Sequence, residues 1–555
     1  MKRHLSALPY AGAGVLATLA GMSAGHLVAA AQNPATSPVL AVGSAVIDLT
    51  PTPVKELAVR ELGTRDKPVL IGSVVLVTLV VSVIAGLLAR RRPALGAGIL
   101  VALVAVAGAL ALLRPFAVAS DVLPAVVAAV VGVGVLAFLV RLLRASASPR
   151  RPGGFETLAG ARSSTTGAGA HSGPVVEEGE ERARLEATDD PEPKPRLLLS
   201  GTSATRRTVL VSAAFVALVS GGIGWLGQRL AAIRIRPEDV DLPAAADPLG
   251  PLPRGLEQRY GGISRFQTRN GDFYRVDVNL SVPVVDLDGW RLEIDGDVDE
   301  ELSLTFDDLL AMDLVERDIT LTCVSNEVGG PYVGAARWLG VPLTTLLDRA
   351  GVGSTADQIY STAVDGFTIS TPLAVALDGR DSMVAVGMNG EALPAEHGFP
   401  ARLVTPGLYG FVGATKWLRR LTLTTYEEQS AYWTDRDWAT EAPIKVSSRI
   451  DTPQAFTTVG KENAVIGGVA WAQTRGIGKV EVRVDGGPWR EATLGPDAGV
   501  AYWRQWFLAW KDATPGRHRV ACRATTLEGD VQTAARATPF PAGSSGIQEI
   551  AVDVA

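Results

Sequence analysis

Five long apolar segments constrain this chain more than any other feature of its sequence. None contains an Asp, Glu, Lys or Arg, and each is apolar on all sides, whereas a buried core helix of a soluble protein keeps a polar stripe. A helix needs roughly 20 apolar residues to cross a bilayer. The segments run over residues 5–31, 69–88, 93–113, 122–140 and 209–226. We therefore expect five transmembrane helices in contact with membrane lipid.

The first segment has two interpretations. Lys2 and Arg3 precede an apolar run that ends in three alanines, which is typical both of a retained helix and of a cleavable signal peptide. The sequence leaves both open, and in each case the following loop lies outside the cytoplasm.

The positions of Lys and Arg in the short loops predict the orientation, because cytoplasmic loops carry an excess of both. Three arginines at 90–92 separate the second and third segments, and four more follow the fourth segment within 141–151. The loop at 31–68 has four basic residues and argues weakly against this orientation, although four acidic residues accompany them. We expect a multi-pass protein of the cell membrane whose residues after about 228 lie outside the cytoplasm.

Composition changes along the chain predict a multi-domain protein. The stretch 145–205 is rich in Gly, Ser, Pro and Glu with almost no aromatic residues, so it cannot bury enough surface to fold. Helix and strand patterns alternate after about 255, and only short strands follow 450. The expected parts are four transmembrane helices in 1–144, a disordered cytoplasmic linker in 145–205, the fifth helix in 206–230, a tether in 231–254, an α+β domain in 255–449 and an immunoglobulin-like β-sandwich in 450–555.

Local patterns predict individual elements of the last two parts. Strands are expected at 290–294 and 318–324, separated by a helix at 306–312 that Thr305 caps. A second helix at 342–350 begins with proline and stops at a glycine, the usual asymmetry. The β-sandwich strands are expected at 464–471, 480–484, 489–494, 503–510 and 516–525, with a turn at 485–487.

Residue counts exclude several classes of site. Two cysteines, Cys323 and Cys522, are too few for a disulfide framework, a four-cysteine zinc site or a c-type haem. The apolar segments contain a single histidine, His26, so we expect no haem between the helices. The formal net charge is -6 and no basic stripe with interleaved aromatics occurs, so we expect no nucleic-acid partner.

Three segments carry residues suited to cofactor chemistry. Residues 318–347 place Cys323 at the end of a buried strand, before a Gly-rich loop where backbone can approach a bulky ligand. A lone cysteine is more often a small buried hydrophobe than a ligand, but two other segments favour a ligand. Residues 273–283 (FYRVDVNLSVP) set an Arg and an Asp between apolar strand positions, and residues 387–421 combine basic side chains with six glycines. Those basic side chains are His397, Arg402 and Lys416.

Together these segments resemble the oxidoreductase molybdopterin-binding domain of the sulfite oxidase and periplasmic methionine-sulfoxide reductase superfamily. The C-terminal β-sandwich resembles that family's molybdenum-cofactor dimerisation domain, which leaves a homodimer through this part open. The resemblance covers roughly 255–555 and implies one molybdenum–molybdopterin cofactor per chain, with Cys323 as the metal's protein ligand. It also implies an oxo-anion substrate beside Arg275. The implied cofactor contacts are Tyr274, His397, Arg402, Gly413, Ala414 and Lys416.

The resemblance implies oxygen-atom transfer to or from a small oxo-anion or sulfoxide, with electrons exchanged with a separate carrier. The alternative for Arg275 is a structural ion pair with a carboxylate such as Asp277. Sulfite oxidases keep a tyrosine ahead of an Asn-Gly pair, whereas this chain has Ala-Val-Gly at 385–387, so the substrate stays open. A second hypothesis is a membrane-tethered adhesion or sensing protein built on a degenerate form of the scaffold.

Paired arginines precede the fifth apolar segment. The run at 204–210, with Arg206 and Arg207, resembles a twin-arginine export signal, with Val209 where phenylalanine is usual. The alternative is an ordinary basic flank of an outward-going helix. A domain that acquires molybdopterin in the cytoplasm has to cross the membrane folded, which favours the export signal.

Overall fold

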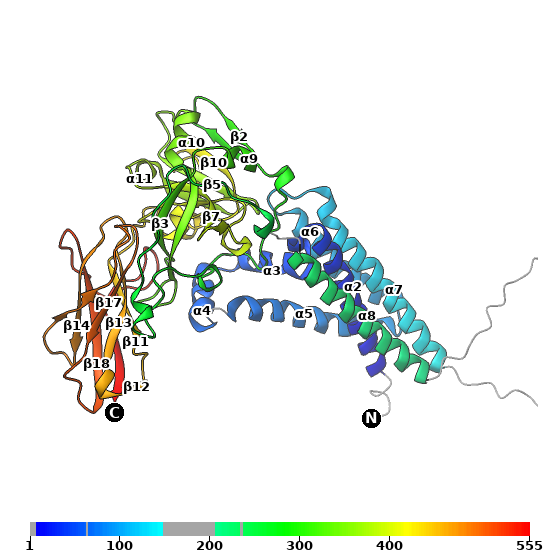
Figure 1. Cartoon of the computed structure of the whole chain (residues 1–555). Coiled ribbons are helices and arrows are strands. Elements are labelled where there is room, and N and C mark those ends of the chain that lie inside the picture. Colours follow the sequence, from blue (N-terminus) through cyan, green and yellow to red (C-terminus); the bar gives the residue numbers. More distant parts are fainter. Residues whose placement is uncertain (1–6, 63–64, 148–205, 234–236) are drawn as a thin grey trace, which may run out of the picture.

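The computed structural model describes residues 7–62, 65–147, 206–233 and 237–555. Within these ranges the chain forms a helix bundle, a mixed α/β region and a C-terminal region of two β-sheets (Figure 1). Nearly all of the expected linker at 145–205 and the first two residues of the twin-arginine-like run lie outside the described residues.

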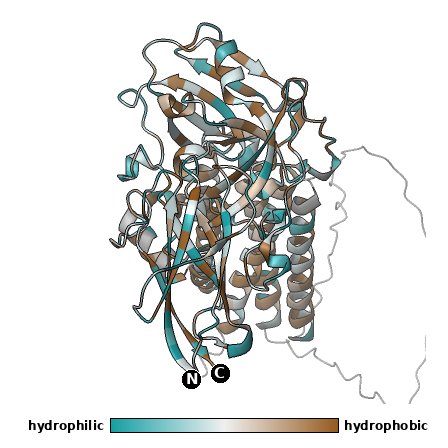
Figure 2. Cartoon of the chain, turned by 60° about the vertical axis from the view of Figure 1, so that its left-hand side comes forward, coloured by the Kyte–Doolittle hydropathy of each residue, from teal (hydrophilic) through white to brown (hydrophobic). Residues whose placement is uncertain are grey.

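The helix bundle contains the long apolar helices that the sequence predicted. Among the described residues, five helical stretches are long and apolar enough to cross a membrane, as the sequence predicted. Many of their apolar side chains face outward, Leu218 with 77% of its surface exposed, and Figure 2 shows apolar residues along these helices. The long helices are α2 (Leu8–Ala31), α5 (Asp66–Ala89), α6 (Pro93–Leu112), α7 (Leu123–Ala147) and α8 (Arg206–Ile233), and the shorter α3 (Pro38–Leu49) and α4 (Thr52–Leu62) connect α2 to α5.

Small residues let these helices pack closely. A Cβ atom on Gly14 of α2 would lie 2.1 Å from the carbonyl oxygen of Ser82, and one on Gly86 of α5 would lie 2.1 Å from that of Tyr10. Glycine at both positions therefore allows the two backbones to touch, as is common between helices in membranes.

The two ends of the bundle differ in what they contact. At one end, Arg144 donates hydrogen bonds to the carbonyl oxygens of Ala89 and Arg90, beside the arginine turn at 90–92. At the other end, α4 and the start of α5 contact the α/β region. The basic turn and the α/β region thus lie at opposite ends of the bundle, which the predicted orientation requires.

Two sheets form the α/β region. In the first, with order β2-β1-β10-β5-β6, β1 pairs in parallel with β10; the second has the order β3-β4-β7-β8, with β9 beside β7. Leu292, Ile294 and Leu421 of the first sheet are buried in one core with Leu346 of helix α10. The strands are β1 (Leu292–Gly296), β2 (Leu302–Leu304), β3 (Val315–Thr322), β4 (Val333–Pro342), β5 (Gln358–Ala363), β6 (Thr368–Pro372), β7 (Met383–Met388), β8 (Glu391–Ala392), β9 (Arg402–Val404) and β10 (Leu418–Thr424). The helices are α9 (Phe306–Leu310), α10 (Leu343–Ala350), α11 (Leu373–Ala376) and α12 (Gly410–Gly413).

Local signals predicted α9 and α10 correctly. Thr305 and Asp308 exchange side-chain and backbone hydrogen bonds at the start of α9, a reciprocal capping box. The last turn of α10 is followed by Gly351, whose φ of +68° suits glycine.

The prediction of a strand at 273–283 was wrong. These residues are all described, and the structure has no strand among them. The side chain of Asp277 accepts a hydrogen bond from the backbone N–H of Asn279 at 3.1 Å. Such local bonds compete with a β-ladder, and the polar side chains also bond other parts of the chain.

The C-terminal region contains two sheets that share a core. Their orders are β11-β13-β17-β16 and β12-β19-β18-β14-β15, and buried side chains such as Ile466, Val480 and Trp506 lie in the common core. The immunoglobulin-like type stays a prediction. The strands are β11 (Ser447–Thr452), β12 (Thr458–Val459), β13 (Val465–Trp471), β14 (Ile477–Val484), β15 (Arg490–Glu491), β16 (Thr493–Leu494), β17 (Arg504–Ala509), β18 (Gly516–Thr526) and β19 (Gln548–Val554).

The single strand predicted at 489–494 is two strands in different sheets. β15 pairs with β14, whereas β16 pairs with β17. Ala492 between them is buried, and its N–H donates to the carbonyl oxygen of Val480. The chain therefore crosses from one sheet to the other within this stretch.

Candidate functional site

Cys323 follows the last residue of β3 and opens a tightly bonded loop. Its N–H donates to the carbonyl oxygen of Tyr332 at 3.0 Å, and its own carbonyl accepts from the N–H of Asn326 at 3.0 Å. The side chain of Asn326 accepts from the N–H of Tyr332 at 2.8 Å, which closes the loop. Burial raises the pKa of the Cys323 thiol, so the sulfur stays protonated at neutral pH unless a metal or cation binds it.

Aromatic side chains from 273–283 and from the Cys323 loop line the same place. The ring of Tyr274 stacks on Phe273, with centroids 5.1 Å apart, and lies 6.3 Å from the ring of Tyr332. Burial, and then the nearby Cys323, hold the pKa of the Tyr274 phenol well above its usual range. A Cβ atom on Gly334 of β4 would lie 2.8 Å from the Phe273 ring, so only glycine lets the β4 backbone lie this close to the ring.

His397 is a neutral hydrogen-bond donor in this site. Its Nε2–H donates to the carbonyl oxygen of Asn270 at 2.8 Å, and its ring meets Phe273 edge-on. Burial, together with the charges of Arg402 and Lys416, lowers the pKa of His397 to about 4. The imidazole therefore adds no positive charge at neutral pH.

Arg402 on β9 is a buried cation. Its guanidinium donates to the carbonyl oxygens of His397 at 3.0 Å and Ala414 at 3.4 Å, and lies 5.0 Å from the Trp338 ring centroid. Among the described residues, its Nε has no hydrogen-bond partner and no carboxylate pairs with it. Burial lowers the pKa of Arg402 to about 10. A buried, uncompensated guanidinium is suited to bind an anionic group.

A short segment after α12 fixes the wall beside Arg402. The N–H of Leu403 in β9 donates to the carbonyl oxygen of Thr415 at 2.9 Å. The N–H of Thr405, just after β9, donates to the carbonyl oxygen of Gly413, also at 2.9 Å. A Cβ on Gly413 would lie 3.0 Å from the Cβ of Thr405. Glycine therefore lets this segment approach β9 and brings the Ala414 carbonyl to the guanidinium of Arg402.

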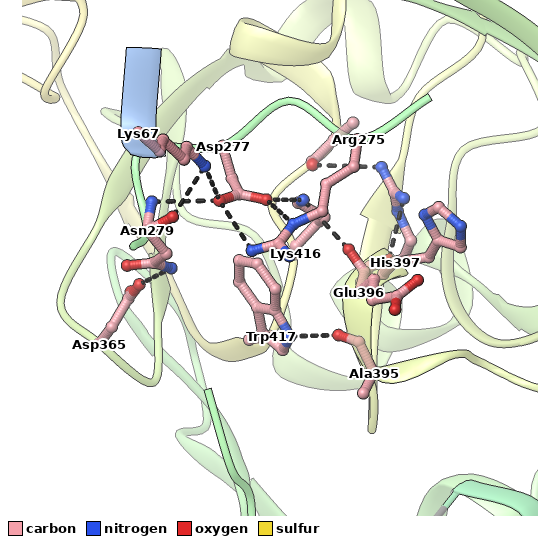
Figure 3. Close-up of polar contacts among 12 residues, drawn as sticks. Lys67, Arg275, Asp277, Asn279, Asp365, Ala395, Glu396, His397, Lys416 and Trp417 are labelled. Atoms are coloured by element: carbon pink, nitrogen blue, oxygen red, sulfur yellow. Dashed lines mark hydrogen bonds and ion pairs between the residues drawn. The ribbon is translucent and has the colours of Figure 1, made fainter. Parts of the chain in front are cut away.

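Three cations converge on Asp277 at the edge of the site (Figure 3). The Asp277 carboxylate, 6% exposed, accepts hydrogen bonds from Lys416 at 2.7 Å, Arg275 Nε at 2.8 Å and Lys67 at 2.9 Å. Burial alone would raise the pKa of this carboxyl, but the three cations outweigh burial and hold it well below its usual range. Burial lowers the pKa of Lys416 to about 8 against the opposing effect of Asp277.

These residues fit a cofactor that brings its own metal ligands. Among the described residues, no three His, Cys, Asp or Glu side chains come together as a metal site. A metal at Cys323 would therefore take one protein thiolate, and a soft thiolate suits a redox-active transition metal. The unpaired guanidinium of Arg402 suits a cofactor phosphate.

Comparison with known proteins identifies this part of the chain. Residues 279–433 match the family described as the oxidoreductase molybdopterin binding domain. The mitochondrial sulfite oxidases of Rattus norvegicus and Homo sapiens are 32% and 33% identical over 303 and 305 residues, which is 46% of this chain and 55% of each relative. This chain carries a molybdopterin-binding oxidoreductase domain of the sulfite oxidase family.

Two further proteins are similar to this part of the chain. NADH nitrate reductase 2 of Nicotiana tabacum is 30% identical over 285 residues, covering 40% of this chain and 31% of that protein. Among solved structures, the sulfane dehydrogenase SoxCD of Paracoccus pantotrophus is 26% identical with a TM-score of 0.45, and the match covers 53% of this chain and 82% of that one. The chain spans about half the length of the sulfite oxidases cited above.

The structure brings most of the residues predicted for the site together. Tyr274, His397, Arg402 and Lys416 lie around the Cys323 loop through the contacts above, and Gly413 and Ala414 form the adjoining wall. Arg275 forms the ion pair with Asp277 that the sequence left as its alternative.

Three further side chains lie near Cys323 or Asp277 and were not predicted from the sequence. Tyr332 and Tyr409 both lie close enough to Cys323 for a thiolate there to raise their pKa values, after burial, and the pKa of Tyr409 rises to about 12. The position of Tyr332 within the Cys323 loop was an available signal. Lys67 is 210 residues from Asp277, and no local pattern connects the two.

Proposed function

We propose that this protein is a membrane-anchored, extracytoplasmic molybdenum oxidoreductase that transfers an oxygen atom to or from a small oxo-anion or sulfoxide. Electrons pass to or from a separate carrier. The observation that carries the proposal is the buried guanidinium of Arg402, next to the Cys323 loop in a molybdopterin domain and with no anion beside it among the described residues.

Each residue of the site has a proposed role. One molybdenum–molybdopterin per chain supplies two-electron redox and oxygen-transfer chemistry when bound. Cys323 is the metal's protein ligand, and Tyr274 and neutral His397 contact the pterin. Arg402, Lys416 and the backbone of Gly413 and Ala414 hold the phosphate end, because basic groups and close backbone suit phosphate.

The charge at the edge of the site favours an anionic substrate. Arg275, Lys416 and Lys67 bring three positive charges to the single carboxylate of Asp277. An excess of positive charge attracts and orients an oxo-anion. The relatives are named for sulfite and nitrate, both small oxo-anions. The Ala-Val-Gly sequence at 385–387 lies in buried β7, so no tyrosine side chain comes from there.

The membrane part serves as anchor, with lipid around the five helices. We place the α/β and C-terminal regions outside the cytoplasm, on the side opposite the arginine turn at 90–92. Helix α2 packs against α5, α7 and α8, which supports a retained first segment. Arg206 and Arg207 at the start of α8 act as a twin-arginine export signal. The C-terminal sheets form an immunoglobulin-like domain through which two chains dimerise.

Metal analysis and a substrate panel test the proposal. The full chain, expressed with molybdate and purified in detergent, is assayed for molybdenum and for turnover of sulfite, nitrate and methionine sulfoxide with artificial electron acceptors and donors. We expect about one molybdenum per chain and turnover of at least one compound. A protein that takes up no molybdenum would instead support the adhesion or sensing hypothesis.

A further inference from the structure

The membrane region contributes a charged side chain to the oxidoreductase site. Lys67 is the second residue of α5, and its ammonium donates to Asp277 Oδ1 at 2.9 Å and to the carbonyl oxygen of Asn279 at 2.7 Å. Figure 3 shows Lys67 reaching Asp277 from the side opposite Lys416. Asp277 therefore links Lys67 to Arg275, the arginine expected beside the substrate.

The two oxygens of Asp277 are occupied differently. Oδ2 accepts from Lys416 at 2.7 Å and from Arg275 Nε at 2.8 Å. Oδ1 accepts from Lys67 at 2.9 Å and from the N–H of Asn279 at 3.1 Å, and the Nη2 group of Arg275 stays at a long 3.4 Å. Arg275 therefore reaches both oxygens of Asp277, but its second contact is long at the oxygen that it shares with Lys67 and Asn279.

A bidentate pair is the preferred geometry of arginine with a carboxylate, because two parallel N–H groups match its two oxygens. Without Lys67, only the N–H of Asn279 would compete with Arg275 Nη2 for Asp277 Oδ1, so the Nη2 contact could shorten. In the structure Arg275 is one-third exposed, and among the described residues its Nη1 group makes no hydrogen bond. A side-on pair uses only Nε and Nη2, so Nη1 is free in any case, and the long contact leaves Nη2 only weakly held by Asp277.

We propose that Lys67 is a positioning residue: by competing for Asp277 Oδ1 it keeps the second contact of Arg275 long and leaves the Nη2 group, as well as Nη1, available to an oxo-anion substrate. Binding of the substrate thus depends on the docking of α5 against the oxidoreductase domain. This inference rests on the proposed oxo-anion substrate and deepens it.

The test compares Lys67→Met with a matched variant, Lys55→Met. Lys55 on α4 is a second lysine that joins the two regions, since its ammonium donates to the Tyr432 hydroxyl at 3.2 Å, away from Asp277. Both changes keep an unbranched side chain and remove one charge. Holoenzyme in detergent is assayed with sulfite, and binding of sulfate, which cannot be oxidised further, is measured by calorimetry.

We expect Lys67→Met to raise KM for sulfite and Kd for sulfate about tenfold, as loss of a charge-assisted hydrogen bond predicts. Molybdenum content and kcat should stay within about twofold of wild type, and Lys67→Arg should restore binding because it keeps a positive charge with N–H donors. Lys55→Met should leave all four quantities unchanged. In an Arg275→Gln background, Lys67→Met should have no further effect on sulfate binding, because the residue through which it acts is absent.

Three results would overturn the inference: unchanged sulfate binding in Lys67→Met, an equal loss in Lys55→Met, or an undiminished effect in the Arg275→Gln background. Equal loss in both lysine variants would mean that only the docking of the two regions matters. Failure of the proposed function is a separate outcome, since it appears as absence of wild-type turnover across the substrate panel, whereas the calorimetric comparison needs no turnover.

Discussion

Lys416 and Asp277 form a buried ion pair, with 2.7 Å between the ammonium and the carboxylate and only 11% and 6% of the two side chains exposed. Each controls the protonation of the other. The pKa of Lys416 is lowered to about 8 by burial, and Asp277 is the first of the groups that oppose this shift. The charge of the site at mildly alkaline pH therefore depends on this one contact.

Replacing Asp277 by Asn should move the alkaline limb of the pH–rate profile to lower pH. Asn keeps the shape but removes the charge that stabilises protonated Lys416, so the pKa of Lys416 falls below about 8. Activity that needs the ammonium is then lost at lower pH. Asp365→Asn is the control, because Asp365 bonds the side chain of Asn279 rather than Lys416. An alkaline limb that stays in place or moves upward contradicts the assignment.

Cys323→Ser should abolish molybdenum binding and turnover while the protein remains folded. A hydroxyl is a poor substitute for a soft thiolate, but it fits the same space and leaves the backbone bonds of the loop intact. Cys522→Ala is the comparison, since Cys522 lies buried in β18. Cys522→Ala should lower the unfolding free energy by about 1 kcal/mol and leave activity unchanged. Near-normal activity of Cys323→Ser would refute its role as the metal ligand.

Arg402→Met should have opposite effects on the empty and the loaded protein. Without cofactor, Arg402 is a buried charge with no counter-ion in the part of the chain that the structure describes, so an apolar side chain of similar length should raise the unfolding free energy by about 1–3 kcal/mol. The same change should lower molybdenum retention, because the anion loses its partner. Denaturant unfolding of protein made without molybdate, beside metal analysis of protein made with it, measures both. A destabilised empty variant would show that Arg402 is already compensated.

The sequence was sufficient wherever a local pattern decides the structure. Apolar length predicted the five long helices, and a threonine cap and a terminal glycine predicted α9 and α10. The motif within 387–421 pointed to His397, Arg402 and Ala414, which are close in the chain, and in the fold Arg402 donates hydrogen bonds to the other two.

Contacts between distant parts of the chain were beyond local patterns. Alternation of polar and apolar residues at 273–283 suggested a strand, but the Asp277 side chain instead accepts hydrogen bonds from the backbone N–H of Asn279 and from Lys67 of α5. The strand β19 was not predicted, although Ile550, Val552 and Val554 alternate with polar or small residues in it. Its pairing with β18 is seen only in the folded structure.

His397→Gln should make the protein less sensitive to acid. The pKa of His397 is about 4 in the folded protein and 6.5 for an exposed histidine, so between these values the unfolded chain binds a proton that the folded one does not. The contribution of neutral His397 to the unfolding free energy is therefore fully present above pH 6.5. It falls by up to about 3 kcal/mol as the pH decreases towards 4. Gln keeps an N–H donor for the Asn270 carbonyl, and unfolding free energies at pH 7 and pH 4.5 measure the change.

His518→Gln provides the opposite sign as a control. Asp485 raises the pKa of His518, so this histidine stabilises the folded state at low pH and the contribution is lost as pH rises. Its replacement should make the protein more sensitive to acid. If both variants changed the pH dependence in the same direction, the protonation states assigned to His397 would be wrong.

The last prediction concerns export and separates two roles of Arg206 and Arg207 at the start of α8. Changing both to Lys keeps two positive charges beside the helix. If they are only a basic cytoplasmic flank, orientation should be unaffected, because Lys and Arg serve that purpose equally. A twin-arginine signal requires the arginines themselves, so the oxidoreductase domain of the Lys-Lys variant should stay in the cytoplasm. Protease added to intact spheroplasts measures this: we expect the domain to be digested in wild type and protected in the variant. Helices α2 to α7 precede the signal, so their membrane insertion should be equal in both proteins and serves as the internal control. Digestion of the variant to the same extent as wild type would defeat the export proposal and leave the flank interpretation.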